Sequence, residues 1–262
     1  MRVDSLVLGG LRCTLVGGGA PTRAETNDRG GPRTAAVLPF PQRFAVVLCH
    51  GYGAPGDDLV SLASEVIRAA PELDARLRFV FPEAPLALSA VGPWDSRAWW
   101  PLDESVLDAA IARGSPIETV RDAPAELSGL RETMYRLLGD LEHAEGVPVS
   151  RVVLGGFSQG AMLATDIALR LPISPAGLGV FSGTLLDANE WALLAPARRG
   201  MPTLVCHGRQ DPLLSFRTAE ALRELLARAG VAVEFVPFDG PHTISPEGFT
   251  AFVAFLRAIL GP

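Results

Sequence analysis

The string GFSQG, residues 156–160, is a Gly-x-Ser-x-Gly motif, which presents a nucleophilic serine at a sharp turn. It follows an apolar, strand-like run and precedes an Ala/Leu-rich, helix-like run. Side chains two positions from the serine would crowd such a turn, and glycines relieve that crowding. The alternative is an ordinary Gly/Ser turn, but this context favours Ser158 as a nucleophile. Ser182, in VFSGT, lacks both flanking glycines and is the weaker candidate.

A nucleophilic serine needs a base. In hydrolases with this motif, the chain order is serine, then an acid, then histidine. Only His207 and His242 follow Ser158. His207 ends an apolar run, so we expect its side chain to pack at a strand end. His242 lies in DGPHTISPEG, a Gly/Pro-flanked loop that suits a proton shuttle. We therefore expect His242 to be the base.

The acid that orients this histidine should lie between Ser158 and His242, just after a strand. Asp211 follows the run TLVCHGRQ, and Asp187 follows GVFSGTLL. We expect Asp211 to be the acid and keep Asp187 as the alternative, because a loop one strand earlier can also reach the histidine. Asp239 is so close to His242 in the sequence that the turn would have to fold back on itself.

These residues need a framework of strands that brings the loops to one edge. Continuously apolar runs are typical of strands covered on both faces, as in a parallel sheet. Such runs occur at Phe44–Cys49, Leu77–Phe81, Arg151–Gly156, Gly177–Gly183, Thr203–Cys206 and Val231–Val236. Helical periodicity follows at 124–143, 222–229 and 249–256. The alternation predicts an α/β doubly wound, mostly parallel sheet with helices on both faces.

The N-terminal part differs from this pattern. Asp4–Leu8 and Leu11–Val16 flank a Gly-Gly pair and predict an antiparallel hairpin at the sheet edge. Residues 17–42 are rich in Gly, Pro and polar side chains, and we expect a mobile loop there. We see no repeat and no second domain, so residues 1–262 are interpreted as a single domain.

Charge and composition exclude several classes of protein. The net charge is −6 with acidic and basic residues interleaved, which argues against a nucleic-acid partner. All 23 basic residues are Arg, so a Schiff-base lysine or a P-loop lysine is impossible. The apolar runs are shorter than the roughly 18 residues that cross a bilayer, so we expect no stable membrane insertion.

Cysteine usage bears on the compartment and on metal binding. Three cysteines are an odd, low count that favours a reducing, cytoplasmic setting. The string Cys-His-Gly occurs at 49–51 and again at 206–208, which raises the alternative of a Cys₂His₂ metal site. Adjacent strand residues point to opposite faces, however, so each pair is poorly arranged to bind one ion. We expect no metal and interpret both strings as strand ends at the ligand-binding edge.

Several strings together carry a family resemblance. LCHGYGAPGDDL, FPEAPLAL, AWWPLD, GGFSQGAML, CHGRQDPLL and GPHTI resemble the phospholipase/carboxylesterase family of α/β-hydrolases, a bacterial branch similar to acyl-protein thioesterases. The similarity runs from about Phe44 to the C-terminus. Departures are Pro241 before the histidine, the segment before Phe44, and a long 103–123 segment that would suit a lid or insertion.

The resemblance implies an α/β-hydrolase fold and a Ser158–Asp211–His242 triad, in agreement with the order argument. It also implies an oxyanion hole formed by the backbone N–H groups of Tyr52 and Gln159, with no cofactor.

We therefore expect a serine hydrolase that cleaves carboxylic esters with short to medium acyl chains through an acyl-enzyme. An acyl-thioesterase, a lysophospholipase and a non-catalytic ligand-binding protein of the same fold are the alternatives. Trp99, Trp100 and Leu213 are the expected substrate-binding residues, with Leu86 and Leu88 as further candidates. The sequence leaves the oligomeric state open and permits a homodimer.

Overall fold

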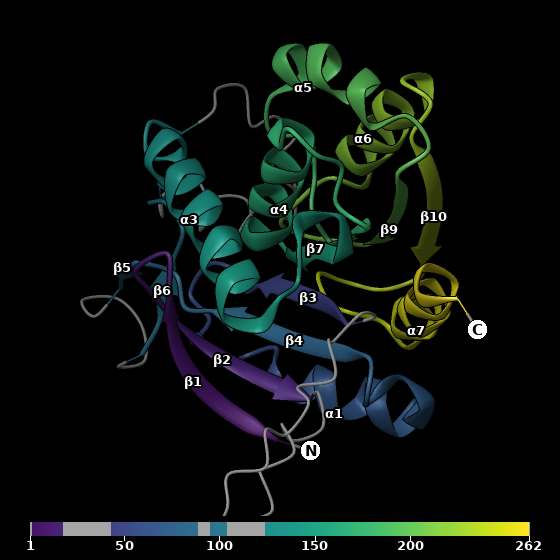
Figure 1. Ribbon diagram of the computed structural model, residues 1–262. Coiled ribbons are helices and arrows are strands. Elements are labelled where there is room, and N and C mark those ends of the chain that lie inside the picture. The colour runs from purple at the N-terminus through teal and green to yellow at the C-terminus, as the bar shows by residue number, and fades with distance from the viewer. Residues whose placement is uncertain (1, 18–42, 89–94, 104–123, 262) are drawn as a thin grey trace, which may run out of the picture.

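Eight strands form the central sheet of the computed structural model, which describes residues 2–17, 43–88, 95–103 and 124–261 (Figure 1). Their order is β1-β2-β4-β3-β7-β8-β9-β10. Strands β4, β3 and β7 to β10 run parallel to one another, whereas β2 pairs antiparallel with both β1 and β4. The predicted mostly parallel sheet with an N-terminal hairpin at its edge is therefore confirmed.

The apolar runs of the sequence become these strands. The strands are β1 (Val3–Leu8), β2 (Leu11–Gly17), β3 (Phe44–Cys49), β4 (Leu77–Pro82), β7 (Val152–Phe157), β8 (Gly177–Phe181), β9 (Pro202–Gly208) and β10 (Ala232–Phe238). Strands β5 (Leu86–Ala87) and β6 (Arg97–Ala98) pair separately. The six predicted parallel strands agree with the observed ones to within two residues at each end. Strands β3, β4, β7, β8 and β9 are almost wholly buried, which explains why their apolar runs are continuous, whereas β10 lies at the sheet edge and is only partly buried.

Helices cover both faces of the sheet. They are α1 (Val60–Ala69), α3 (Leu127–Glu145), α4 (Gln159–Arg170), α5 (Ala188–Leu194), α6 (Phe216–Arg228) and α7 (Pro246–Leu260), with short 3₁₀ turns at Pro71–Leu73, Val149–Arg151 and Ala195–Arg198. Buried residues of α3, α4 and α6 share one hydrophobic cluster with alternate strand residues, and those of α1 and α7 share another. The predicted doubly wound architecture is present.

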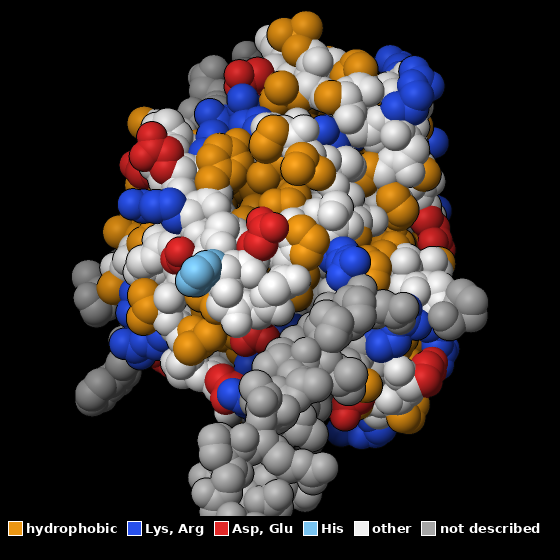
Figure 2. Space-filling model, in the orientation of Figure 1, with side chains coloured by type: hydrophobic (Ala, Val, Ile, Leu, Met, Phe, Trp, Pro, Cys, Tyr) orange, Lys and Arg blue, Asp and Glu red, His pale blue; other side chains and the backbone are white. Residues whose placement is uncertain are grey.

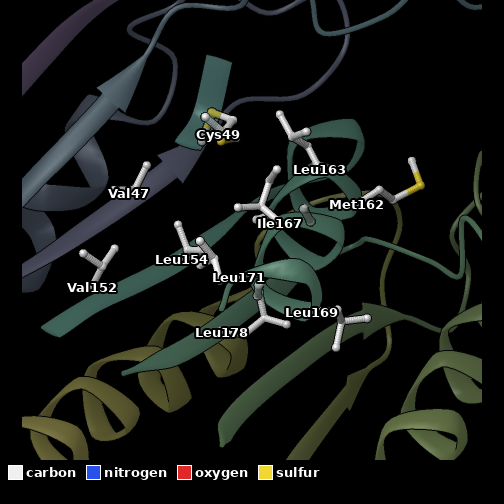
Figure 3. Close-up of a cluster of buried hydrophobic side chains, with 14 of the residues drawn as sticks. Val47, Cys49, Val152, Leu154, Met162, Leu163, Ile167, Leu169, Leu171 and Leu178 are labelled. Carbon is white, nitrogen blue, oxygen red and sulfur yellow. The ribbon is translucent and has the colours of Figure 1, made fainter. Parts of the chain in front are cut away.

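The helix α4 lies against the middle of the sheet. Leu163 and Ile167 of α4 are fully buried and pack in the same cluster as Val47 of β3 and Leu154 of β7 (Figure 3). Asp166 on the same helix is also fully buried and accepts hydrogen bonds from Arg131, Arg170 and Trp191. Apolar packing and this ion cluster together hold the helix that follows Ser158.

The face that carries α3, α4 and α5 shows acidic, basic and hydrophobic side chains interspersed (Figure 2). None of the helices in the described segments is both long enough and apolar enough to cross a membrane. Gly17 closes β2 and Asp103 lies in a described loop, but the rest of the expected mobile loop (17–42) and of the expected lid or insertion (103–123) lies outside the described residues.

Candidate active site

Ser158 lies on a tight turn between β7 and α4. Its backbone has φ 54° and ψ −120°, a conformation that non-glycine residues rarely adopt. A Cβ atom at Gly156 would lie 2.4 Å from the carbonyl oxygen of Cys49, and one at Gly160 would lie 2.1 Å from it. The two glycines of the motif are therefore required by the close approach of β3 to the turn.

Asp211 and His242 meet at the same edge of the sheet. Asp211 follows β9, and His242 lies in the loop between β10 and α7. Nδ1 of His242 donates to Oδ2 of Asp211 at 2.6 Å. Pro241, which directly precedes His242, still allows this contact. This hydrogen bond leaves Nε2 of His242 available for chemistry.

The carboxylate of Asp211 is almost completely buried, which by itself disfavours its ionised form. Hydrogen bonds from His207, His242 and the backbone N–H of Leu214 outweigh that burial, and they hold the pKa of Asp211 well below its usual range. Asp211 is thus an anion at neutral pH, able to stabilise a positive charge on His242.

The alternative acids lie in other surroundings. Asp187 caps the N-terminus of α5, where its Oδ1 accepts a hydrogen bond from the N–H of Glu190 at 3.1 Å. Asp239 is exposed and lies 3.6 Å from Arg209. Among these three candidates, Asp211 is the one that contacts His242.

Ser158 and His242 line a common cavity of about 160 Å³. The wall is mostly apolar, as in sites that bind small molecules with a few polar groups fixing orientation. The lining residues are Gly51, Tyr52, Trp100, Leu102, Phe157, Ser158, Gln159, Met162, Leu186, Leu213, Leu214 and His242. The ring of Phe157 packs on that of His242, with 4.7 Å between ring centroids.

The expected substrate-binding residues divide into two groups. Trp100 and Leu213 line the cavity. Trp99 is outside the lining set: it is buried against His50 and donates its indole N–H to the His50 carbonyl at 2.9 Å. Leu86 and Leu88 are also outside the lining set. The two neighbouring tryptophans thus differ: Trp100 forms part of the cavity wall, whereas Trp99 packs against His50.

Both expected oxyanion residues, Tyr52 and Gln159, lie along the cavity beside Ser158. Gln159 is the first residue of α4, so its N–H has no acceptor within the helix. The loop of Tyr52 is held by His50, whose Nδ1 donates to Gly51 O at 2.8 Å and whose Nε2 accepts from the N–H of Ala84 at 3.1 Å. Burial lowers the pKa of His50, so its ring is neutral.

The side chain of Gln159 has a role that the sequence did not indicate. Its Oε1 accepts from the N–H of Trp99 at 2.9 Å, and its Nε2 donates to the carbonyl of Trp100 at 2.8 Å. This pair of hydrogen bonds fastens the tryptophan segment to the turn of Ser158. In the sequence, the one feature that sets Gln159 apart is its position directly after Ser158.

The two Cys-His pairs are far apart in the sheet. Strands β7 and β8 lie between β3, which ends at Cys49, and β9, which contains Cys206 and His207. Burial raises the pKa of the Cys206 thiol to about 12, so it remains a neutral core group. The strings mark two strand ends at one edge, in keeping with the expectation from sequence.

Comparison with known proteins agrees with this geometry. A family model described as Phospholipase/Carboxylesterase matches residues 40–260. The chain is 30% identical to acyl-protein thioesterase 1 of Eremothecium gossypii over 242 residues, covering 87% of this chain and 93% of the relative. It is 30% identical to a probable carboxylesterase of Oryza sativa subsp. japonica over 215 residues, covering 81% and 86%.

A solved structure, that of esterase PE8, superposes with a TM-score of 0.69 at 28% identity, covering 83% of this chain and 93% of that one. TT1662 from Thermus thermophilus superposes with a TM-score of 0.66 over all of both chains, and its 19% identity indicates the fold alone. On the strength of the family match, which spans most of its length, the chain belongs to the phospholipase/carboxylesterase family of α/β-hydrolases.

Proposed function

We propose that this protein is a carboxylesterase-type serine hydrolase in which Ser158 is the nucleophile, His242 the general base and acid, and Asp211 the orienting anion. The observation that carries the proposal is the hydrogen bond of 2.6 Å between Asp211 and His242 at the cavity that Ser158 lines. Relatives named carboxylesterase and acyl-protein thioesterase support the same reaction class.

The reaction proceeds in two acyl transfers. His242 removes the proton of Ser158 as Oγ attacks the carbonyl carbon, and Asp211 stabilises the imidazolium that forms. His242 then returns the proton to the departing alcohol or thiol. In the second half, His242 activates a water that attacks the acyl-enzyme, and Ser158 leaves with its proton restored.

The backbone N–H groups of Tyr52 and Gln159 receive the negative charge of the tetrahedral intermediate. Each such donor contributes about 3–4 kcal/mol in enzymes of this kind. The position of Gln159 at the start of α4 supports its part of this assignment, because the helix dipole there favours negative charge.

The size and the apolar wall of the cavity favour substrates with short to medium acyl chains. Its volume of about 160 Å³ and its apolar wall, which includes Trp100 and Leu213, suit a small hydrocarbon group. Esters, acyl-thioesters and lysophospholipids share one tetrahedral intermediate, so the same residues would serve each. We propose carboxylic esters as the main class and keep the other two as alternatives.

The deciding experiment measures hydrolysis of nitrophenyl esters of increasing chain length and of an acyl-thioester by wild type and S158A. We expect the short and medium esters to be cleaved and S158A to fall to near background. Undiminished turnover by S158A would refute the assignment. A fluorophosphonate probe tests the non-catalytic alternative, since a pure ligand-binding protein would leave Ser158 unlabelled.

We further propose a single domain over residues 1–262 and a bacterial, cytoplasmic protein. The lysine-free composition supports a bacterial source. The three buried free cysteines support a cytoplasmic location. A homodimer is permitted by this proposal, and sedimentation of the purified protein tests it.

A further inference from the structure

His207 is the next-to-last residue of β9 and is completely buried. Its Nε2 lies 3.0 Å from the carbonyl oxygen of Leu214 and 3.3 Å from Oδ2 of Asp211. A carbonyl oxygen can only accept a hydrogen bond, so Nε2 must carry the proton. The Nε2–H group therefore donates to the loop that follows Asp211, and the Asp211 carboxylate lies close to the same nitrogen.

The other ring nitrogen of His207 does not stabilise the fold. Its Nδ1 is buried and has no hydrogen-bond partner within the described part of the chain. A buried polar atom without a partner is destabilising, and an apolar side chain of similar size would avoid this cost. The useful part of this imidazole is thus its Nε2–H group.

Four donors surround the Asp211 carboxylate. Oδ1 accepts from the backbone N–H groups of Leu213 at 2.8 Å and Leu214 at 2.9 Å. Oδ2 accepts from His242 and is approached by His207. Two backbone amides fix one oxygen, so the tilt of the other depends on the side chains around it.

We propose that His207 is a positioning residue for the reaction of Ser158: its Nε2–H group holds Oδ2 of Asp211 in the orientation that accepts from His242. The bond to Leu214 O strengthens this effect, since the same loop supplies the two amides that bind Oδ1. The inference rests on the proposed function and extends it to a second histidine that makes no contact with substrate.

Two variants separate the N–H group from the bulk of the side chain. H207L removes the donor and keeps an apolar side chain of similar length. H207Q keeps an N–H donor at about the reach of Nε2. We expect H207L to lower kcat by between about tenfold and a hundredfold with KM nearly unchanged, since a small misplacement of the triad acts on the chemical step. H207Q should recover most of that loss.

A second measurement is independent of any substrate. The proton shared by His242 Nδ1 and Asp211 should give a far-downfield ¹H NMR resonance in wild type. It should shift or broaden in H207L and return in H207Q. Folded H207L with wild-type kcat and an unchanged resonance would overturn the proposal. Should H207L fail to fold, H207N takes its place, because its shorter amide cannot reach Asp211, and equal behaviour of H207N and H207Q would overturn it.

The two proposals fail in different ways. If wild type hydrolyses none of the esters or thioesters while the resonance still depends on His207, the proposed function is wrong and the positioning role stands. If ester hydrolysis depends on Ser158 while H207L is fully active, the proposed function stands and the positioning role is wrong.

Discussion

Oγ of Ser182 donates a hydrogen bond to the carbonyl oxygen of Thr243 at 3.2 Å, which ties the end of β8 to the loop that carries His242. Ser182 is completely buried and has φ 47°. Ser158 and Ser182 are the two non-glycine residues with positive φ in the described segments. Strained residues of this kind gather at functional sites, so the hydroxyl of Ser182 is a candidate support for the loop of His242.

Two substitutions of Ser182 should therefore lower activity alike but differ in stability. S182A and S182G both remove the hydroxyl and should lower kcat several-fold, because the His242 loop loses an anchor. S182G also relieves the positive φ and should be about 0.5–1 kcal/mol more stable than S182A. Urea unfolding and steady-state kinetics measure the two effects. Wild-type kcat in both variants would show that the Ser182 hydroxyl does not support the His242 loop.

Asp211 and Asp187 offer a matched pair of substitutions. D211N leaves His242 without its anionic partner and should lower kcat by a factor on the order of 10⁴. D187N should leave kcat unchanged, and it should cost little stability because Asn caps helices about as well as Asp. Similar losses in both variants would point to a general effect on folding.

The lowered pKa of Asp211 also predicts a change in acid stability. Its ionisation stabilises the fold above the unfolded pKa of about 3.9, and this contribution is lost as the pH falls below that value toward the folded pKa. D211N has no such group to titrate. The unfolding free energy of D211N should therefore fall less than that of wild type between pH 5 and pH 3.

The strands and the turn of Ser158 were predictable because their signals are local. A strand buried on both faces needs a continuous apolar run, and the approach of Cys49 to Gly156 and Gly160 leaves room for glycine alone. Residue type and order are therefore sufficient at these positions. They also sufficed to favour Asp211 over Asp187, because chain order and strand ends limit which loops can meet.

The contacts that hold the site residues in place could not be predicted because they depend on tertiary packing. Trp99 and Trp100 are the same residue type, and only the fold places one against His50 and the other in the cavity. Ser182 is the weaker nucleophile candidate in the sequence because it lacks the flanking glycines, and its positive φ leaves no trace in residue type. The clamp made by the Gln159 side chain likewise joins groups about 60 residues apart in the chain.

His50 predicts a second dependence on pH. Burial lowers its pKa, and protonation would turn its Nε2 from an acceptor of the Ala84 N–H into a donor that faces it. The folded state thus resists a proton that the unfolded chain binds below about pH 6.5. Stability is retained above that pH and should decline as the pH falls toward the folded pKa.

The measurement is the free energy of unfolding in urea at pH 7, 6 and 5. H50Q should reduce the decline, and the matched variant H143Q, at an exposed position of α3, should keep it. An identical decline in wild type and H50Q would assign the effect to another group.

Gly160 and Gly139 test how tightly the turn of Ser158 is packed. Both lie in helices, α4 and α3. A Cβ atom at Gly160 would lie 2.1 Å from Cys49 O and 2.4 Å from His50 O, whereas one at Gly139 meets nothing within 4 Å. G160A should therefore cost about 3 kcal/mol or more, because backbone atoms must move. G139A should stabilise the protein by up to about 1 kcal/mol, since Ala is the better helix former.

Urea unfolding and labelling of Ser158 by a fluorophosphonate probe distinguish the outcomes. G139A should label at the wild-type rate. G160A should label far more slowly even under conditions where it remains folded, because relief of the overlap at Cys49 must move the turn that sets Ser158 and the N–H of Gln159. If G160A were as stable and as reactive as wild type, the contact of α4 with β3 would be looser than the structure shows, and the strained geometry of Ser158 would not depend on it.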